Sequence, residues 1–380
     1  MKAIFMGTPQ FAVNSLDTLI SKGVDVGLVI TRTDKKQGRN MKIEMPPVKK
    51  RALELGLEVY QPEDIKSQEA VDKIRQINPD IIIVTAYGKI LPTEILNMPK
   101  YGCINVHASL LPKYRGASPI NTCLLNGDTI TGITTMYMNE ELDSGDIILK
   151  DELEISLDDD YVSLTEKLAK LSEKTLGNII NMLNMSMDLP RLQQNHQNAT
   201  YCTLITKEMG HIDYSKSADE IINTIRGLNS FSIYNDTNFK IFKAKKLEDK
   251  SSDKVGMIVK CDENELVVTT ATKDISLLQV QMAGKKKMMI EDFLRGGRTK
   301  SIVCSVLSVT TTRHCPTHSL SIASHRRAFI SYLPKLSVYT SVSLSLFSIL
   351  QSATGLPSSS VTLPVIIIGN LNFSNICAIR

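Results

Sequence analysis

Short apolar runs alternate with amphipathic segments along the first 150 residues. The run "KAIFMG" predicts a strand at 2–7. Val13, Leu16 and Ile20 then recur at intervals of three and four residues, which predicts a helix. "VDVGLVIT", "DIIIVTAYG" and "TGITTMYMN" predict further strands, and "VKKRALELG" predicts a short helix between the first two of these. Strands separated by helices are typical of parallel sheets, so we expect an α/β fold with a doubly wound, mostly parallel (Rossmann-like) sheet.

A long helix and a linker precede a change of pattern at about residue 206, which indicates a second domain. Residues 162–187 carry leucines and isoleucines on one face of a long predicted helix, and a polar segment follows. A helix near "SADEIINTIRGL" and four short apolar runs then predict a smaller β-barrel (OB-like) domain. The expected organisation is a catalytic domain at 1–189, a linker at 190–205, the β-barrel domain at 206–297 and an atypical tail at 298–380.

The tail differs in composition from the rest of the chain. Residues 298–380 contain no Asp or Glu, seven Lys or Arg, many serines and no useful periodicity. The remainder carries 37 basic against 40 acidic residues, so contact with nucleic acid has to come from a local basic patch. We expect a tail that is poorly ordered or translated from an altered reading frame. Its His314, Cys315 and His318 have no fourth ligand at a suitable spacing, so no metal site is expected.

The first residues, the apolar runs and the cysteines bear on the expected location of the protein in the cell. The first residues, "MKAIFMGTPQF", have one Lys and a short apolar run, which indicates a strand and not a signal peptide. No window offers about 20 uninterrupted apolar residues. The seven cysteines are scattered without a CxxC pair, which favours reduced thiols. We expect a cytoplasmic monomer without membrane contact.

Polar residues that can take part in catalysis lie at the end of one predicted strand. In "GCINVHASLLPKYRGASPI", Asn105 and His107 close an apolar run and a polar loop follows. Ligands of doubly wound sheets bind beyond the carboxyl ends of the strands. Further on, "MNEELDSGDIIL" contains Asp143. An amide and an imidazole can donate to a developing oxyanion, and a carboxylate can orient the imidazole and accept a proton. With no Ser or Cys nucleophile in place, this set suits direct transfer of an acyl-level carbon to an amine without a metal.

Each of these residues also has a structural explanation. Asn105 can be a turn or cap residue, His107 a buried structural group, and Asp143 a residue that shapes a turn. Only their joint occurrence favours a catalytic site.

Two long motifs resemble a known enzyme family. "NVHASLLPKYRGASPI" and "GDTITGITTMYMNEELDSGDI" resemble the signature of the folate-dependent formyltransferases, which use 10-formyltetrahydrofolate. The resemblance implies that Asn105, His107 and Asp143 are catalytic. It also implies a folate site formed by Ser109, Leu110, Leu111 and Pro112.

The remaining segments point to one branch of that family. "TRTDKKQGRNMKIEMPPVKKRA" (31–52) is similar to a loop by which the methionyl-tRNA formyltransferases contact initiator tRNA. "HIDYSKSADEIINTIRGLN" and "LQVQMAGKKKMMIEDFLRG" resemble their second domain, and the resemblance covers about residues 1–296. It implies initiator methionyl-tRNA as the partner, with contacts from Arg39, Lys42 and Lys49.

Two alternatives stay open at this point. Formyltransferases that act on an amino sugar share the catalytic core, so the acceptor could be a sugar amine. A relative that binds RNA but has lost activity would also keep these motifs.

Overall fold

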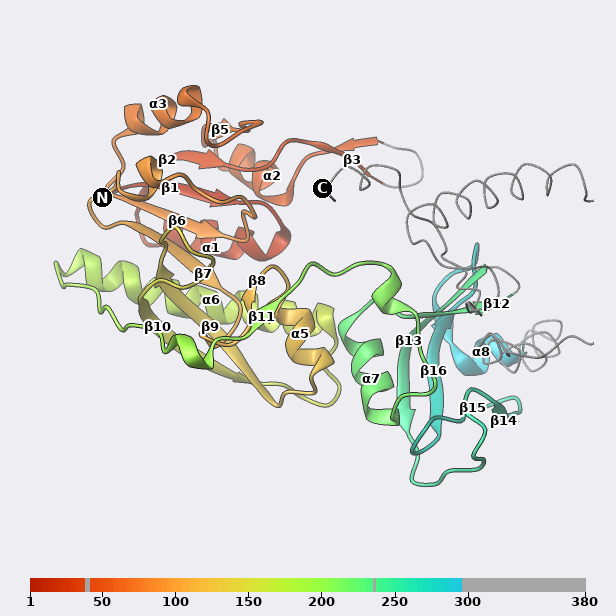
Figure 1. The fold of residues 1–380 in the computed structure, drawn as a ribbon. Coiled ribbons are helices and arrows are strands. Elements are labelled where there is room, and N and C mark those ends of the chain that lie inside the picture. Colours follow the sequence, from red (N-terminus) through yellow and green to blue (C-terminus); the bar gives the residue numbers. More distant parts are fainter. Residues whose placement is uncertain (38–41, 235–236, 296–380) are drawn as a thin grey trace, which may run out of the picture. The chain divides into compact units, whose positions relative to one another are not determined.

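The computed structural model describes residues 1–37, 42–234 and 237–295 (Figure 1). The tail at 298–380, including the three residues that were considered as metal ligands, lies outside the described residues, as does Arg39. Within the described residues, no helix combines the length and the apolar character that crossing a membrane requires.

A mostly parallel sheet organises the first domain. Among the described residues its strand order is β10 (Ile147–Glu154), β9 (Ile130–Tyr137), β7 (Cys103–His107), β6 (Ile81–Thr85), β1 (Lys2–Gly7), β2 (Asp25–Ile30) and β5 (Val59–Tyr60). The strands from β7 to β5 pair in parallel, whereas β9 and β10 pair in antiparallel fashion at one edge. The expected doubly wound, mostly parallel sheet is confirmed.

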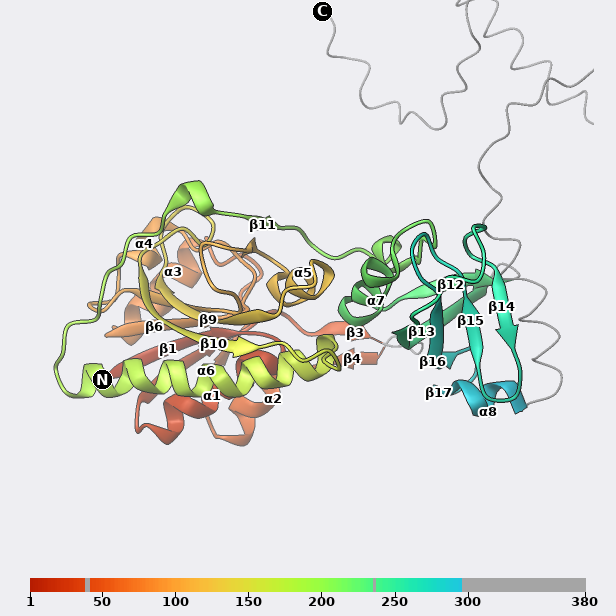
Figure 2. The same cartoon turned by 90° about the horizontal axis from the view of Figure 1, so that it is seen from below.

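Helices cover both faces of this sheet because its central strands are apolar on both sides. In β1, Ala3 and Phe5 point to one core, and Ile4 and Met6 point to the other, as the two-residue period of a strand requires. The first face is covered by α1 (Gln10–Ser21), α2 (Pro47–Glu54), α5 (Pro119–Leu125) and α6 (Tyr161–Asn184). The second face is covered by α3 (Gln68–Ile77) and α4 (Thr93–Leu96). Figure 2 shows the long helix α6 running along the sheet.

Local capping explains where two of the helices begin. The Asp160 carboxylate accepts hydrogen bonds from backbone N–H groups in the first turn of α6, and the Ser163 hydroxyl accepts one from the Asp160 backbone N–H. Ser217 and Glu220 form the same reciprocal arrangement at the start of α7 (Ala218–Gly227). Such capping boxes satisfy backbone N–H groups that have no partner inside the helix.

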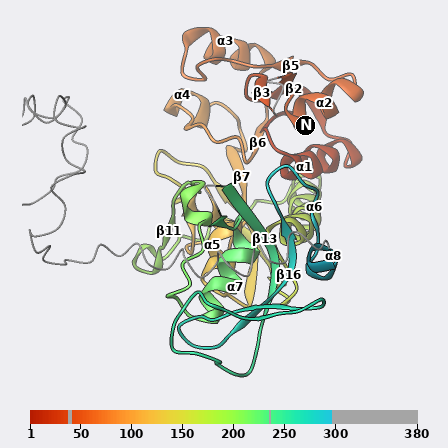
Figure 3. The same ribbon diagram turned by 90° about the vertical axis from the view of Figure 1, so that its right-hand side faces the viewer.

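The second domain is built on an antiparallel sheet. Its described strands follow the order β12 (Phe231–Tyr234), β13 (Thr237–Lys246), β16 (Ile275–Gln281), β15 (Leu266–Val268) and β14 (Ile258–Cys261), with β17 (Met288–Met289) on β16. Helix α7 packs on β13, and α8 (Ile290–Arg295) packs on β16 (Figure 3). The expected smaller, β-rich second domain is confirmed, and its sheet is antiparallel. Its OB-like closure stays a prediction, because the described strands pair in an open order.

The segment expected as a linker lies on the catalytic domain. Leu192 pairs with Ile147 at the sheet edge, and β11 (Tyr201–Cys202) pairs in parallel with β8 (Arg115–Gly116). One short 3-10 helix, His196–Asn198, lies within this segment, and another, Glu208–Gly210, follows it. A small antiparallel pair, β3 (Lys35–Gln37) with β4 (Lys42–Glu44), lies in the basic loop.

Candidate active site

The period of β7 places Asn105 and His107 on the same face of the sheet. Ile104, which precedes Asn105, and Val106, which lies between the two polar residues, point into the core beneath α6. The side chains of Asn105 and His107 therefore point away from that core. His107 is the last residue of β7 and is only 6% exposed. The strand therefore holds an amide and an imidazole side by side on a rigid element.

Asp143 reaches this pair from the turn between β9 and β10. Asp143 Oδ1 accepts a hydrogen bond from Asn105 Nδ2 at 3.2 Å, and its Oδ2 accepts one from the Gly116 backbone N–H at 2.8 Å. The Asp143 backbone has φ +46°, a left-handed conformation that costs about 1 kcal/mol for most residues and that Asp tolerates better than most. Strand β9 runs antiparallel to β7, so Tyr137, the last residue of β9, pairs with Ile104. The turn after β9 therefore has to run back along β7 before Asp143 can contact Asn105 and Gly116.

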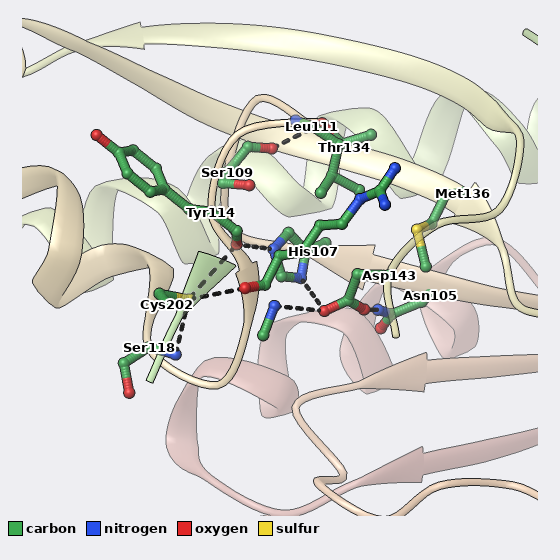
Figure 4. Close-up of polar contacts among 12 residues, drawn as sticks. Asn105, His107, Ser109, Leu111, Tyr114, Ser118, Thr134, Met136, Asp143 and Cys202 are labelled. Atoms are coloured by element: carbon green, nitrogen blue, oxygen red, sulfur yellow. Dashed lines mark hydrogen bonds and ion pairs between the residues drawn. The ribbon is translucent and has the colours of Figure 1, made fainter. Parts of the chain in front are cut away.

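His107 is held by a carbonyl as well as by the carboxylate (Figure 4). Its Nε2 lies 2.9 Å from the Tyr114 carbonyl oxygen, and its Nδ1 lies 3.7 Å from Asp143 Oδ2. A carbonyl oxygen can only accept, so Nε2 carries a proton, and Nδ1 is the nitrogen that can gain or lose one. We expected the carboxylate to orient the imidazole, but the shorter bond comes from Tyr114. The structure brings Asn105, His107 and Asp143 into one cluster.

Tyr114 is itself fixed at several points. Its hydroxyl donates to Asp128 at 2.6 Å and accepts from Asn126 at 2.9 Å, and its backbone N–H donates to the Thr200 hydroxyl at 2.9 Å. Burial and the bond to Asp128 raise the pKa of Tyr114 to about 12, so the hydroxyl stays a donor at neutral pH. These bonds keep the carbonyl that faces His107 in one place.

The residues expected to bind folate form the turn after β7. Ser109 and Leu111 are fully buried, whereas Leu110 and Pro112 are half-buried. Thr134 Oγ1 donates to the Ser109 carbonyl at 2.6 Å and accepts from the Leu111 N–H at 3.1 Å, and the Ser109 hydroxyl donates within the turn at 2.6 Å. The Ser109 hydroxyl is thus used to shape the turn, and direct contact of these four residues with folate stays a prediction.

Only part of the expected tRNA contact lies in the described structure. Lys49 forms an ion pair with Asp34 at 2.7 Å, and Gln61 donates to the same carboxylate at 2.8 Å. The hydrogen bond from Lys49, supported by that from Gln61, lowers the pKa of Asp34. Lys42 begins β4, and Arg39 lies outside the described residues. The charge of Lys49 is therefore already neutralised within the protein.

Sequence reasoning missed the residues that hold the Asp143 turn from behind. Gln194 and Arg115 are both buried and are hydrogen-bonded to each other at 2.7 Å, across 79 residues of chain. The Arg115-Gly116 pair was visible in the loop after β7. Gln194 lies in a polar stretch without periodicity, and no local pattern distinguished it from its neighbours.

A cavity of about 700 Å³ flanks the same turn. The residues lining it include Tyr137, Asn139, Ser144, Asp146, Arg191 and His196. The Arg191 guanidinium lies 3.6 Å above the Tyr137 ring and 3.7 Å from Asp146. The turn that carries Asp143 and the 190–205 segment thus line a polar depression together.

Comparisons with known proteins agree with this architecture. The family model described as "Formyl transferase" matches residues 1–180, and "Formyl transferase, C-terminal domain" matches residues 204–298, so the tail is unmatched. A methionyl-tRNA formyltransferase from Caldanaerobacter subterraneus subsp. tengcongensis is 45% identical over 301 residues, which is 78% of this chain and 97% of the relative. One from Clostridioides difficile is 43% identical over 302 residues, with the same coverage.

A solved structure shows the same fold at lower identity. The N-formyltransferase from Helicobacter canadensis, in complex with folinic acid and dTDP-3-aminofucose, has a TM-score of 0.55 and 20% identity. The match covers 74% of this chain and 99% of that structure. With both family models matched and relatives above 40% identity over nearly their whole length, the chain belongs to the formyl transferase family.

Proposed function

We propose that this protein transfers the formyl group of 10-formyltetrahydrofolate to the α-amine of methionyl-tRNA, and that initiator tRNA carries this methionine. Several relatives named methionyl-tRNA formyltransferase, at 41–45% identity, support this acceptor. The basic loop at 31–52 supports the same acceptor, because the amino-sugar formyltransferases share the catalytic core and part of the second domain but not this loop.

The observation that carries the proposal is the cluster of Asn105, His107 and Asp143, in which the amide is hydrogen-bonded to the carboxylate and the imidazole Nδ1 lies 3.7 Å from it. The Asn105 amide has two N–H groups and uses one on Asp143, which leaves one to donate to a carbonyl oxygen that becomes negative. Such a donor set fits a bound formyl group. The folate co-substrate supplies a formyl carbon at the acyl level. As the new amide bond to the methionine nitrogen forms, the bond from this carbon to the folate nitrogen breaks, and tetrahydrofolate leaves with the proton that the amine gives up.

The three side chains then have separate roles. Asn105 donates its remaining N–H to the negative charge that develops when the amine adds, a contribution of about 3 kcal/mol by comparison with other oxyanion holes. His107 adds a second donor of this kind through Nδ1 when that nitrogen carries a proton, because its Nε2–H is used on the Tyr114 carbonyl. Asp143 holds His107 in place and helps to remove the proton of the attacking amine. Because a free α-amine has a pKa of about 7.7–8.0, a sizeable minority of the acceptor amine is already neutral near pH 7, and removing its proton is a modest demand. Holding the two reactants together contributes roughly 7–11 kcal/mol more.

Binding of tRNA depends in this proposal on the basic loop. Arg39 is the strongest candidate for a phosphate contact, since a guanidinium binds phosphate with two parallel hydrogen bonds. Lys42 adds charge in the same loop. Lys49 contributes less, because Asp34 neutralises it.

A formyl-transfer assay on the full-length protein tests the proposal. Purified protein, 10-formyltetrahydrofolate and charged initiator tRNA should give formyl-methionyl-tRNA, whereas sugar-nucleotide amines should give no formylated product. A chain that ends at Gly297 is assayed in parallel, to separate an inactive core from an inhibitory tail. Product from the sugar amine alone would support the amino-sugar alternative. No product from either chain would support the inactive RNA-binding relative.

A further inference from the structure

The segment that joins the two domains carries a side chain aimed at the catalytic turn. Gln194 is only 3% exposed. Its Nε2 donates to the Asp143 carbonyl oxygen at 2.9 Å and to the Gly145 carbonyl oxygen at 2.8 Å. One amide therefore holds the backbone on both sides of Ser144, within the turn that presents the Asp143 carboxylate.

A buried arginine determines which way this amide points. Gln194 Oε1 accepts from Arg115 Nε at 3.2 Å and from Arg115 Nη2 at 2.7 Å. Since a guanidinium has donors only, the oxygen of Gln194 has to face Arg115, and its NH₂ group has to face the two carbonyls. Both hydrogens of the amide nitrogen are then used.

The same segment provides the other partners of Arg115, which is 2% exposed. Its Nη2 lies 3.3 Å from His196 Nδ1, and its Nη1 lies 3.5 Å from the Tyr201 hydroxyl. The backbone N–H of Arg115 also donates to the Thr200 carbonyl at 2.8 Å. The joining segment is thus attached to the loop after β7 through side chains and backbone together.

That attachment reaches the catalytic cluster by two routes. From the β8 side, the Tyr114 carbonyl contacts His107 and the Gly116 N–H contacts Asp143. From the other side, Gln194 holds the carbonyl of Asp143 itself. Because Asp143 has a left-handed backbone, a small rotation there would move its carboxylate away from its partners.

We propose that Gln194 is a positioning residue for the formyl transfer: it holds the Asp143 turn in the geometry in which the carboxylate meets Asn105 and His107. The joining segment is then part of the active-site framework and more than a tether between domains. This inference rests on the proposed function, since it concerns the same site. Without Gln194 the site would still bind both substrates, but Asp143 would be misplaced for the chemical step.

The test compares Gln194→Glu with Gln197→Glu. The first variant keeps the size of the side chain and an acceptor for Arg115 but loses both N–H donors to the turn. The second makes the same chemical change at an exposed position three residues along. Formyl transfer is measured for kcat and for KM of both substrates. Hydrogen–deuterium exchange of residues 139–147 is followed on the full-length protein without substrate, and Gln194→Met serves as a second variant without added charge.

The proposal expects kcat to fall roughly 100-fold in Gln194→Glu, the scale that a misplacement of about 1 Å produces, with each KM within about threefold of the parent. Exchange in 139–147 should rise in both Gln194 variants and stay unchanged in Gln197→Glu. Parent-like kcat in both Gln194 variants, or a loss confined to KM, would overturn the positioning role while leaving the proposed function intact. If the parent protein transfers no formyl group, the proposed function fails and the exchange measurement alone decides whether Gln194 holds the turn.

Discussion

Asn105 Nδ2 and Asp143 Oδ1 lie 3.2 Å apart although 38 residues separate them in the chain. The contact joins a side chain on the sheet to one on the turn after an antiparallel neighbour. It joins the amide to the carboxylate, and His107 Nδ1 lies 3.7 Å from the same carboxylate, so the three side chains form one cluster. Substitutions within this cluster are therefore expected to affect the chemical step more than binding.

Asn105→Ala should lower kcat by roughly 100–1000-fold, because it removes a donor to the developing oxyanion. KM for the formyl donor should change by less than about threefold. Steady-state kinetics with methionyl-tRNA measure both values. Asn97→Ala, at an exposed helix end, is the matched control and should keep parent activity. Near-parent turnover of Asn105→Ala would contradict the assigned role.

Asp143→Asn should lower kcat by about 100-fold or more with little effect on stability. Asn accepts the left-handed backbone and keeps an oxygen for the Gly116 N–H, so the change removes the negative charge and the acceptor of the Asn105 amide. Asp143→Ala loses both the tolerance of the left-handed backbone and the acceptor oxygen, so its free energy of unfolding should also be about 1 kcal/mol lower than that of the parent. Thermal unfolding beside the kinetic assay separates the two effects. Equal activity of Asp143→Asn and the parent would rule out a role for the charge.

Arg39→Ala should raise KM for tRNA. It should also reduce the slope of log(kcat/KM) against the logarithm of salt concentration by about one, the value expected for one phosphate contact. Lys49→Met should have a smaller effect on both, since Asp34 already neutralises that charge. The measurement is kcat/KM at several salt concentrations. If Lys49→Met proves the more damaging change, the assignment of the phosphate contact is wrong.

Lys49→Met should lower the free energy of unfolding at pH 7 by about 1 kcal/mol. The hydrogen bond from Lys49 depresses the pKa of Asp34 below its ordinary value of 3.8, so the stabilisation is present above that value and is lost as pH falls through the folded-state pKa. The difference between parent and variant should therefore shrink below pH 4. Urea unfolding at pH 7 and at pH 3 gives the two differences. A difference that grows on acidification would contradict this sign.

Gly145→Ala should destabilise the protein by about 1–3 kcal/mol and reduce activity with it. A Cβ at this position would clash with the Tyr137 carbonyl oxygen, which is rigid backbone, so the turn that carries Asp143 has to shift. Gly177→Ala is the control. Its Cβ would meet the flexible end of Lys22, and alanine in α6 should be neutral or stabilise by about 0.5–1 kcal/mol. Unfolding temperature and kcat of both variants check this.

Local patterns along the sequence determined much of this protein. The position of Asn105 and His107 at the end of an apolar run marked them as candidates, and strands separated by helices indicated a doubly wound sheet. The motifs around both segments also identified the family. These features follow from residues that are close in the chain, where periodicity and turn chemistry act.

Only the tertiary structure decided how distant segments meet. The antiparallel direction of β9, the Tyr114 carbonyl opposite His107 and the neutralisation of Lys49 by Asp34 depend on strand register and on loop paths. Gln194 shows this most clearly. Among its neighbours in "RLQQNHQN" it has no distinguishing pattern, and its importance arises because chain folding buries it between Arg115 and the Asp143 turn. A buried amide between two partners in different segments is a property of the fold, because local sequence does not encode which distant groups will satisfy it.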